Sequence, residues 1–95
     1  MKYKSIIFTG HSIQRIFERE IEPEDIEVSI ENGEIIEEYL NDKPYPSFLI
    51  LHYINGKPIH VVSSFDKDSE TVYLITAYFP DISIWDETFK IRRTK

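Results

Sequence analysis

The spacing of apolar residues divides the chain into an N-terminal part with helical periodicity and a longer part typical of β-strands. Four apolar residues recur three or four positions apart and predict a helix over residues 10–20 with one core-facing side. They are Ile13, Ile16, Phe17 and Ile21. Thr9 precedes them as a helix cap, because its side-chain oxygen can accept a hydrogen bond from a free amide of the first turn.

A second helix is indicated by residues that favour helix ends. Pro23 suits a first-turn position, the two acidic residues after it favour the positive end of the helix dipole, and Gly33 follows the last turn. Ile26 and Ile30 lie one turn apart and are expected to anchor this helix in the core.

From residue 34 onward the apolar pattern changes to alternation or to short continuous runs, which predict four strands. The expected strands cover residues 34–40, 47–54, 58–65 and 71–78. The order of elements is therefore two helices followed by four strands.

The two middle strands are joined by Asn55-Gly56, a pair that supplies the positive φ angles of a two-residue hairpin turn. Such a turn fixes the register and places Leu51 opposite His60. Because neighbouring residues of a strand point to opposite faces, His52 and His60 should lie on different faces of the sheet.

The register of the last two strands is less constrained, because a longer loop joins them. Pairing Phe65 with Thr71 would place Thr76 opposite His60 and Tyr78 diagonally adjacent to it. After these strands the chain becomes irregular and ends in the basic segment KIRRTK.

Length and composition predict a single domain over residues 1–95. The chain has no cysteine, so neither a disulfide nor a thiolate site is expected, and a reducing cytoplasm fits. The N-terminus carries only the short apolar run 6–8, which is too short for a signal peptide or a membrane span. We therefore expect a soluble cytoplasmic protein.

The net charge of −6 argues at first sight against a nucleic-acid ligand, because phosphates are bound mainly by Lys and Arg. The charges are unevenly distributed, however. Residues 18–42 hold eleven of the seventeen acidic residues and one base, Arg19, whereas the other segments carry ten bases and six acids. One surface could therefore still attract phosphate. The acidic segment 18–42 would then lie away from the ligand.

On a helical wheel His11, Arg15 and Arg19 form a basic stripe opposite the expected core face. Guanidinium groups can form bidentate hydrogen bonds to phosphate oxygens, and an imidazole can accept or donate a proton near neutral pH. The alternative is an ordinary solvated helix face in which the two arginines pair with Glu18 or Glu22.

The histidines of the strands allow two interpretations each. His60 is either a core histidine satisfied by hydrogen bonds or a catalytic group that shares its face with Tyr78, whereas apolar neighbours make His52 structural. Three dispersed histidines without cysteine do not match zinc spacing, and the acids of residues 66–70 lack the glycine of a calcium loop. We expect no metal and no cofactor.

Several segments in fixed order resemble a known family. They are GHSIQRIFEREI, ENGEIIEEY, PYPSFLILHYINGKPIHVV, ITAYFPDISIW and KIRRTK. Together they resemble the domain-of-unknown-function family 4258 over nearly the whole chain. That family is grouped with the RelE-like toxins, so the resemblance implies an α+β fold in which two N-terminal helices pack on a four-stranded antiparallel sheet (ααββββ).

The polar positions that match the family are His11, Arg15, Arg19, His60, Tyr78, Trp85 and Arg92. The resemblance implies that the chain is the toxin of a toxin–antitoxin system. Its expected partners are RNA and a small antitoxin protein, and a homo-oligomer is also possible. The expected activity is metal-independent RNA cleavage. The expected catalytic residues are His11, Arg15, His60, Tyr78 and Arg92, and the expected RNA contacts are Arg19, Trp85 and Arg93.

In the simplest mechanism a base activates the ribose 2′-hydroxyl and an acid protonates the leaving oxygen. His11 or His60 would be the acid or base, Arg15 and Arg92 would stabilise the phosphorane charge, and Tyr78 would donate a proton or stack on a base.

Two other functions remain open. One is a non-catalytic binding module that uses exposed aromatic anchors on a protein partner, with Trp85, Phe89 and Tyr45 as candidates. The other is a toxin that acts by binding alone. Convergence of the five expected catalytic residues in one cleft would favour the enzyme, and their dispersal would favour the binding module.

Overall fold

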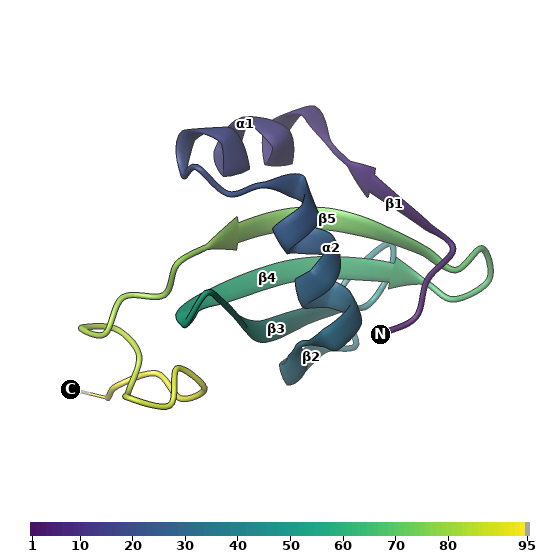
Figure 1. Cartoon of the computed structure of the whole chain (residues 1–95). Helices are drawn as coiled ribbons and strands as arrows, with labels where there is room; N and C mark the ends of the chain where they lie inside the picture. The colour runs from purple at the N-terminus through teal and green to yellow at the C-terminus, as the bar shows by residue number, and fades with distance from the viewer. Residues whose placement is uncertain (95) are drawn as a thin grey trace.

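A computed structural model describes residues 1–94, and Lys95, the last residue of the basic segment, lies outside them. The elements are β1 (Ser5–Phe8), α1 (Gly10–Glu18), α2 (Pro23–Asn32), β2 (Glu34–Tyr39), β3 (Ser47–Ile54), β4 (Lys57–Asp66) and β5 (Thr71–Tyr78). The strands form one sheet in the order β1-β5-β4-β3-β2 (Figure 1). The boundaries of the two helices and of the last four strands are close to those that the sequence predicts.

The predicted four-stranded antiparallel sheet is nevertheless wrong. The apolar run near the N-terminus forms a fifth strand, β1, which pairs in parallel with β5 from Ser5 opposite Thr71 to Phe8 opposite Leu74. The sheet is therefore mixed, and both helices lie between β1 and β2 instead of starting the fold. A four-residue strand has little local signal, and its partner lies near the other end of the sequence, so periodicity could not reveal it.

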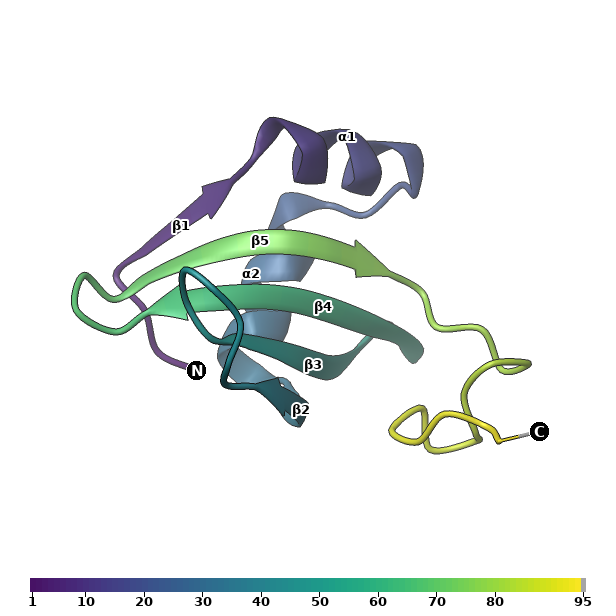
Figure 2. The same ribbon diagram turned by 180° about the vertical axis from the view of Figure 1, so that it is seen from behind.

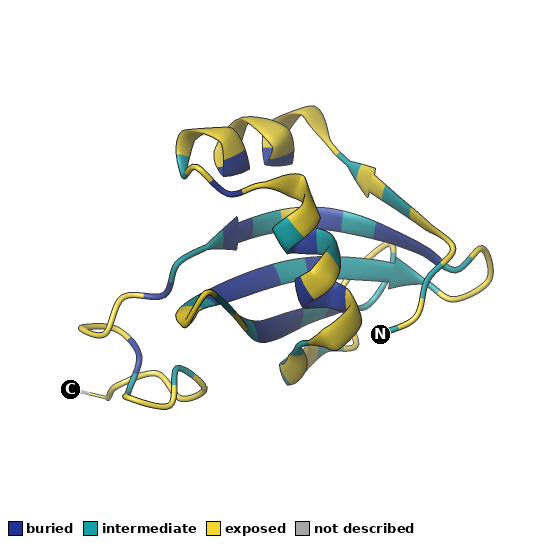
Figure 3. Ribbon diagram, viewed as in Figure 1, coloured by how far each residue is buried: buried dark blue, intermediate teal, exposed yellow. Residues whose placement is uncertain are grey.

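Both helices cover the same face of the sheet (Figures 1 and 2). α1 packs mainly against β5, whereas α2 crosses β3 and β4. The buried core lies between these layers and joins Ile16, Ile21, Ile26 and Ile30 to Ile50, Ile59, Val61, Val72, Leu74 and Ala77 (Figure 3). Ile26 and Ile30 are completely buried, which confirms them as the anchors of α2.

The predicted core face of α1 is only half right. Ile13 is 49% exposed and Phe17 is 81% exposed, while Ser12 is completely buried. The helix is rotated from the expected orientation by roughly one residue step, about 100°. Because α1 lies over β5 near the edge of the sheet, it buries a narrow stripe and leaves the rest of its apolar side uncovered.

The cap of α1 is as predicted. Thr9 accepts a hydrogen bond at its hydroxyl oxygen from the amide of Ser12, at 3.1 Å. The Ser12 hydroxyl donates in return to the Thr9 carbonyl, at 2.9 Å, which satisfies this buried polar side chain. Among residues 1–94, no helix is long and apolar enough to cross a membrane.

The β3–β4 hairpin confirms the register set by Asn55-Gly56. Both turn residues have positive φ angles, and Leu51 lies opposite His60. His52 pairs with Ile59, so the two strand histidines point to opposite faces as expected.

The expected β4–β5 register is wrong. Phe65 pairs with Val72 instead of Thr71, and a bulge further shifts the pairing between Val62 and Ser63. As a result His60 lies directly opposite Tyr78. A bulge adds one unpaired residue to one strand, and no glycine or proline marks it in this sequence.

The C-terminal segment, residues 79–94, leaves β5 and continues past the end of the sheet (Figure 2). It contacts the face that the helices leave open, because the Phe89 carbonyl binds His60 and Arg92 pairs with Glu37. Trp85, a residue of this segment, is only 3% exposed. The backbones of Trp85 and Arg92 form an isolated antiparallel bridge, which folds this segment back on itself. The segment thus brings side chains from the end of the sequence onto the middle strands.

Candidate functional site

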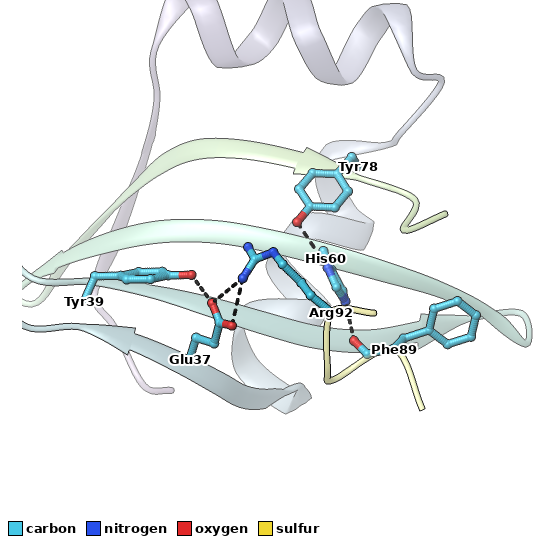
Figure 4. A network of polar contacts seen from close by, with 6 residues as sticks. All are labelled: Glu37, Tyr39, His60, Tyr78, Phe89 and Arg92. Atoms are coloured by element: carbon cyan, nitrogen blue, oxygen red, sulfur yellow. Dashed lines mark hydrogen bonds and ion pairs between the residues drawn. The ribbon is translucent and has the colours of Figure 1, made fainter. Parts of the chain in front are cut away.

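A group of polar and aromatic residues meets where the C-terminal segment crosses the open face of the sheet (Figure 4). We name it the tail cluster, and its members are Glu37, Tyr39, His60, Tyr78, Trp85, Phe89 and Arg92. Strand pairing explains the shared face. Glu37 lies opposite Leu49, and Leu49 lies opposite Val62, so the three side chains point to the same side of the sheet. His60 is two positions from Val62 on β4 and therefore points to that side too.

His60 forms the buried floor of the tail cluster and is completely inaccessible to solvent. Its Nε2 lies 2.7 Å from the carbonyl oxygen of Phe89, and its Nδ1 lies 3.2 Å from the hydroxyl of Tyr78. Because a carbonyl can only accept, Nε2 carries the proton and Nδ1 accepts from the tyrosine. Both ring nitrogens are therefore satisfied by a neutral imidazole.

Aromatic rings enclose this histidine. Tyr78 and Trp85 approach it edge-on, with ring centroids 5.3 and 4.5 Å from the imidazole. Burial lowers the pKa of His60, and the hydrogen bond to the Phe89 carbonyl opposes that shift. Burial likewise raises the pKa of Tyr78. In this arrangement His60 and Tyr78 are both neutral, and their hydrogen bonds hold the C-terminal segment on the sheet.

Arg92 and Glu37 form the accessible part of the tail cluster. The guanidinium Nη1 lies 3.1 Å from Glu37 Oε1 and 3.4 Å from Oε2, and the side chains are 55% and 30% exposed. The hydroxyl of Tyr39 donates to Glu37 Oε2. The guanidinium also lies 4.6 Å from the centre of the Trp85 ring, a cation–π distance.

The surroundings of Tyr39 and Arg92 favour the protonated form of both side chains. Burial and the hydrogen bond to Glu37 raise the pKa of Tyr39, while the charge of Arg92 opposes the shift. Burial lowers the pKa of Arg92, but Tyr39 and Glu37 outweigh it and raise the pKa. A carboxylate, a guanidinium and a protonated phenol thus meet at a solvent-accessible point and could accept a proton, stabilise an oxyanion and donate a proton.

Glu37 is a candidate that sequence reasoning missed. It belongs to the acidic segment 18–42, which is expected to lie away from an RNA ligand. In this segment Glu34 pairs with Lys90 at 3.0 Å, and Glu37 pairs with Arg92. These contacts form because β2 is the edge strand over which the C-terminal segment passes. The alternation of residues 34–39 could have indicated a common face for Glu37 and Tyr39, but not their partner.

The structure brings together some of the predicted site residues. His60, Tyr78, Trp85 and Arg92 meet in the tail cluster. Arg93 lies beside it, where its Nε donates to the carbonyl of Ile82 at 2.7 Å. Trp85 is buried between His60 and Arg92, so a base cannot stack on it without displacement of the segment.

The basic stripe of α1 does not join this group. His11 and Arg15 are exposed on α1, which packs on the other side of the sheet (Figure 1). Arg19 is not on the solvated face, because it donates to the hydroxyl of Thr76 at 3.1 Å and to the carbonyl of Ala77 at 2.8 Å. The rotation of α1 splits the expected stripe and makes Arg19 a structural link to β5.

Two of the three aromatic anchors expected for a binding module are occupied within the chain. Trp85 is buried, Phe89 is half-buried, and Tyr45 stacks on Tyr73 with ring centroids 5.5 Å apart. The rings of Trp85 and Tyr45 are thus engaged within the chain, so the three residues do not form one exposed aromatic surface. Within residues 1–94, no group of three or more His, Cys, Asp or Glu side chains could hold a metal ion.

The sheet, its two helices and the tail cluster define a small α+β protein with an accessible carboxylate–guanidinium pair on the open face of the sheet. The chain belongs to the family described as "Domain of unknown function (DUF4258)", whose family model matches residues 8–79. The match includes the sheet residues of the tail cluster and stops before Trp85 and Arg92. Comparisons with curated proteins and with solved structures gave no match.

Proposed function

We propose that this protein is a cytoplasmic toxin of the RelE-like kind, paired with a small antitoxin protein, and that it cleaves RNA without a metal. The placement among toxins rests on the family resemblance. The chemistry rests on one observation, the contact of Glu37 with both Arg92 and Tyr39 at a partly exposed point of the sheet.

In the proposed reaction, Glu37 removes the proton of a ribose 2′-hydroxyl, and the 2′-oxygen forms a bond to the neighbouring phosphorus. Arg92 binds the phosphoryl oxygens and stabilises the charge of the phosphorane. The bond from phosphorus to the 5′-oxygen then breaks, and Tyr39 protonates the leaving oxygen. The products are a 2′,3′-cyclic phosphate and a 5′-hydroxyl end.

The hydrogen bond between Tyr39 and Glu37 would reset the site. After cleavage Glu37 holds the proton of the 2′-hydroxyl and Tyr39 lacks one, so transfer between them restores the starting forms. Arg92 is free to change partners, because an exposed ion pair contributes only about 0–1 kcal/mol. A phosphate can therefore take the guanidinium from Glu37.

His60 is a positioning residue in this proposal. It holds the Phe89 carbonyl and Tyr78, and so fixes the segment that carries Arg92. His11 and Arg15 lie on the other side of the sheet and take no part in the proposed step.

Cleavage of a synthetic RNA in the presence of a chelator tests the chemistry. Glu37→Gln removes the base with little change in shape and should lower single-turnover cleavage by about 10²–10⁴-fold. Glu34→Gln is the matched control, because Glu34 lies on the same strand and pairs with Lys90, and it should leave the rate unchanged. Equal rates for wild type and Glu37→Gln would refute the mechanism.

Growth experiments test the biological role. Expression of the chain alone should slow bacterial growth, the Glu37→Gln variant should not, and co-expression of the neighbouring small gene should restore growth. Normal growth at verified expression of folded protein would argue against a toxin.

A further inference from the structure

An apolar groove lies along α1 and the start of α2, away from the tail cluster. Its apolar lining includes Ile13, Phe17, Ile21 and Pro23, and its volume is about 510 Å³. Phe17 is 81% exposed, which is unusual for a large aromatic side chain on a helix beside the core. The groove therefore presents contiguous apolar surface that the chain itself does not cover.

The rim of this groove is acidic. Glu20 and Glu22 line it, and Glu18 and Glu24 are exposed beside them in the sequence. The base in this stretch, Arg19, points away and donates to Thr76 and Ala77 of β5. Negative charges consequently flank the apolar surface with no positive charge among the lining residues.

We propose that the groove docks a basic amphipathic segment of another protein. The apolar face of that segment would cover Ile13 and Phe17, and Lys or Arg beside that face would pair with Glu20 and Glu22. A second copy of this chain fits poorly, because two-fold pairing through this face would bring two acidic rims together. The inference is independent of the proposed cleavage, since the groove shares no residue with the tail cluster.

Two synthetic helical peptides provide the probe. One carries a Leu/Ile face flanked by Lys, and the other replaces each Lys with Glu. The basic peptide should bind and shift amide resonances mainly within residues 13–23, with an affinity that falls as salt rises. The acidic peptide should not bind.

Variants then locate the binding surface. Phe17→Ala should weaken binding of the basic peptide by about tenfold or more, the effect expected of a central anchor. It should leave the melting temperature nearly unchanged, because Phe17 is mostly exposed. Ile84→Ala is the matched control, an exposed apolar residue of the C-terminal segment, and should bind as the wild type does.

Three results would overturn the proposal. They are equal binding of the acidic peptide, absence of binding by the basic peptide, and a concentration-dependent dimer that Phe17→Ala dissociates. RNA cleavage by Phe17→Ala should equal that of the wild type, so a failure of this proposal is distinguishable from a failure of the proposed cleavage.

Discussion

His60 and Tyr78 lie directly opposite each other on β4 and β5, with the imidazole Nδ1 3.2 Å from the phenolic oxygen. The other ring nitrogen binds the Phe89 carbonyl, so one buried side chain joins two strands to the C-terminal segment. This segment in turn carries Arg92 to Glu37. The geometry of the proposed catalytic pair therefore depends on a neutral His60.

Stability should fall in mild acid. Burial lowers the pKa of folded His60 below its ordinary value of 6.5, so the unfolded chain binds the proton first as pH decreases. The stabilisation is fully present above pH 6.5 and is lost as pH falls toward the folded pKa. Urea unfolding at about pH 7.5 and about pH 5.5 measures the change. His60→Gln should remove this dependence, and His52→Gln should keep it.

The same histidine variant separates structure from catalysis. His60→Gln cannot reproduce both hydrogen bonds of the imidazole, and it should cost about 1–3 kcal/mol of stability. Cleavage per folded molecule should fall less than about tenfold, because His60 only positions other groups. The readouts are thermal melting and single-turnover cleavage. An unchanged melting temperature with a loss of about 10²-fold or more would instead make His60 the proton-transfer group.

Gly33 ends α2 where the chain passes close to β3. A Cβ atom here would lie 2.5 Å from the Ile50 Cγ2, 2.5 Å from the Ser29 carbonyl oxygen and 2.8 Å from that of Leu51. Backbone atoms cannot move aside cheaply, so Gly33→Ala should destabilise the fold by about 1–3 kcal/mol. Gly10→Ala is the control, because a Cβ there meets nothing within 4 Å. Equal denaturation midpoints for the two variants would contradict this account.

RNA binding should depend on salt through Arg92. If its guanidinium contacts a phosphate, Arg92→Gln should reduce the slope of log affinity against log salt by about one unit. Arg15→Gln removes an exposed arginine on the opposite side of the sheet and should leave the slope unchanged. Fluorescence anisotropy over a salt series provides the measurement. Equal effects of both variants would mean that RNA contacts both sides of the molecule.

Local sequence signals predicted much of the fold. Asn55-Gly56 defined the β3–β4 hairpin and its register, because the turn geometry depends on two adjacent residues. Thr9 and Gly33 marked helix ends for the same reason. The predicted β4–β5 register is wrong for two reasons. The longer loop lets Phe65 pair with Val72 instead of Thr71, and the bulge has no compositional signal.

The candidate site was only partly visible in the sequence. His60 and Tyr78 were expected on one face, but the one-residue register shift and the bulge together place them directly opposite each other. Glu37 could not be distinguished from the other acids of segment 18–42, because its partner Arg92 follows 55 residues later in the sequence.

The sequence by itself determined the two helices, the four longer strands and the central hairpin, because these depend on spacing and turn residues within a few positions. Only the tertiary structure decided the parallel pairing of β1 with β5, the rotation of α1 that exposes Phe17, and the contact of Arg92 with Glu37. Each of these results from packing between segments far apart in the chain, where the free energy of burial and pairing outweighs local preference.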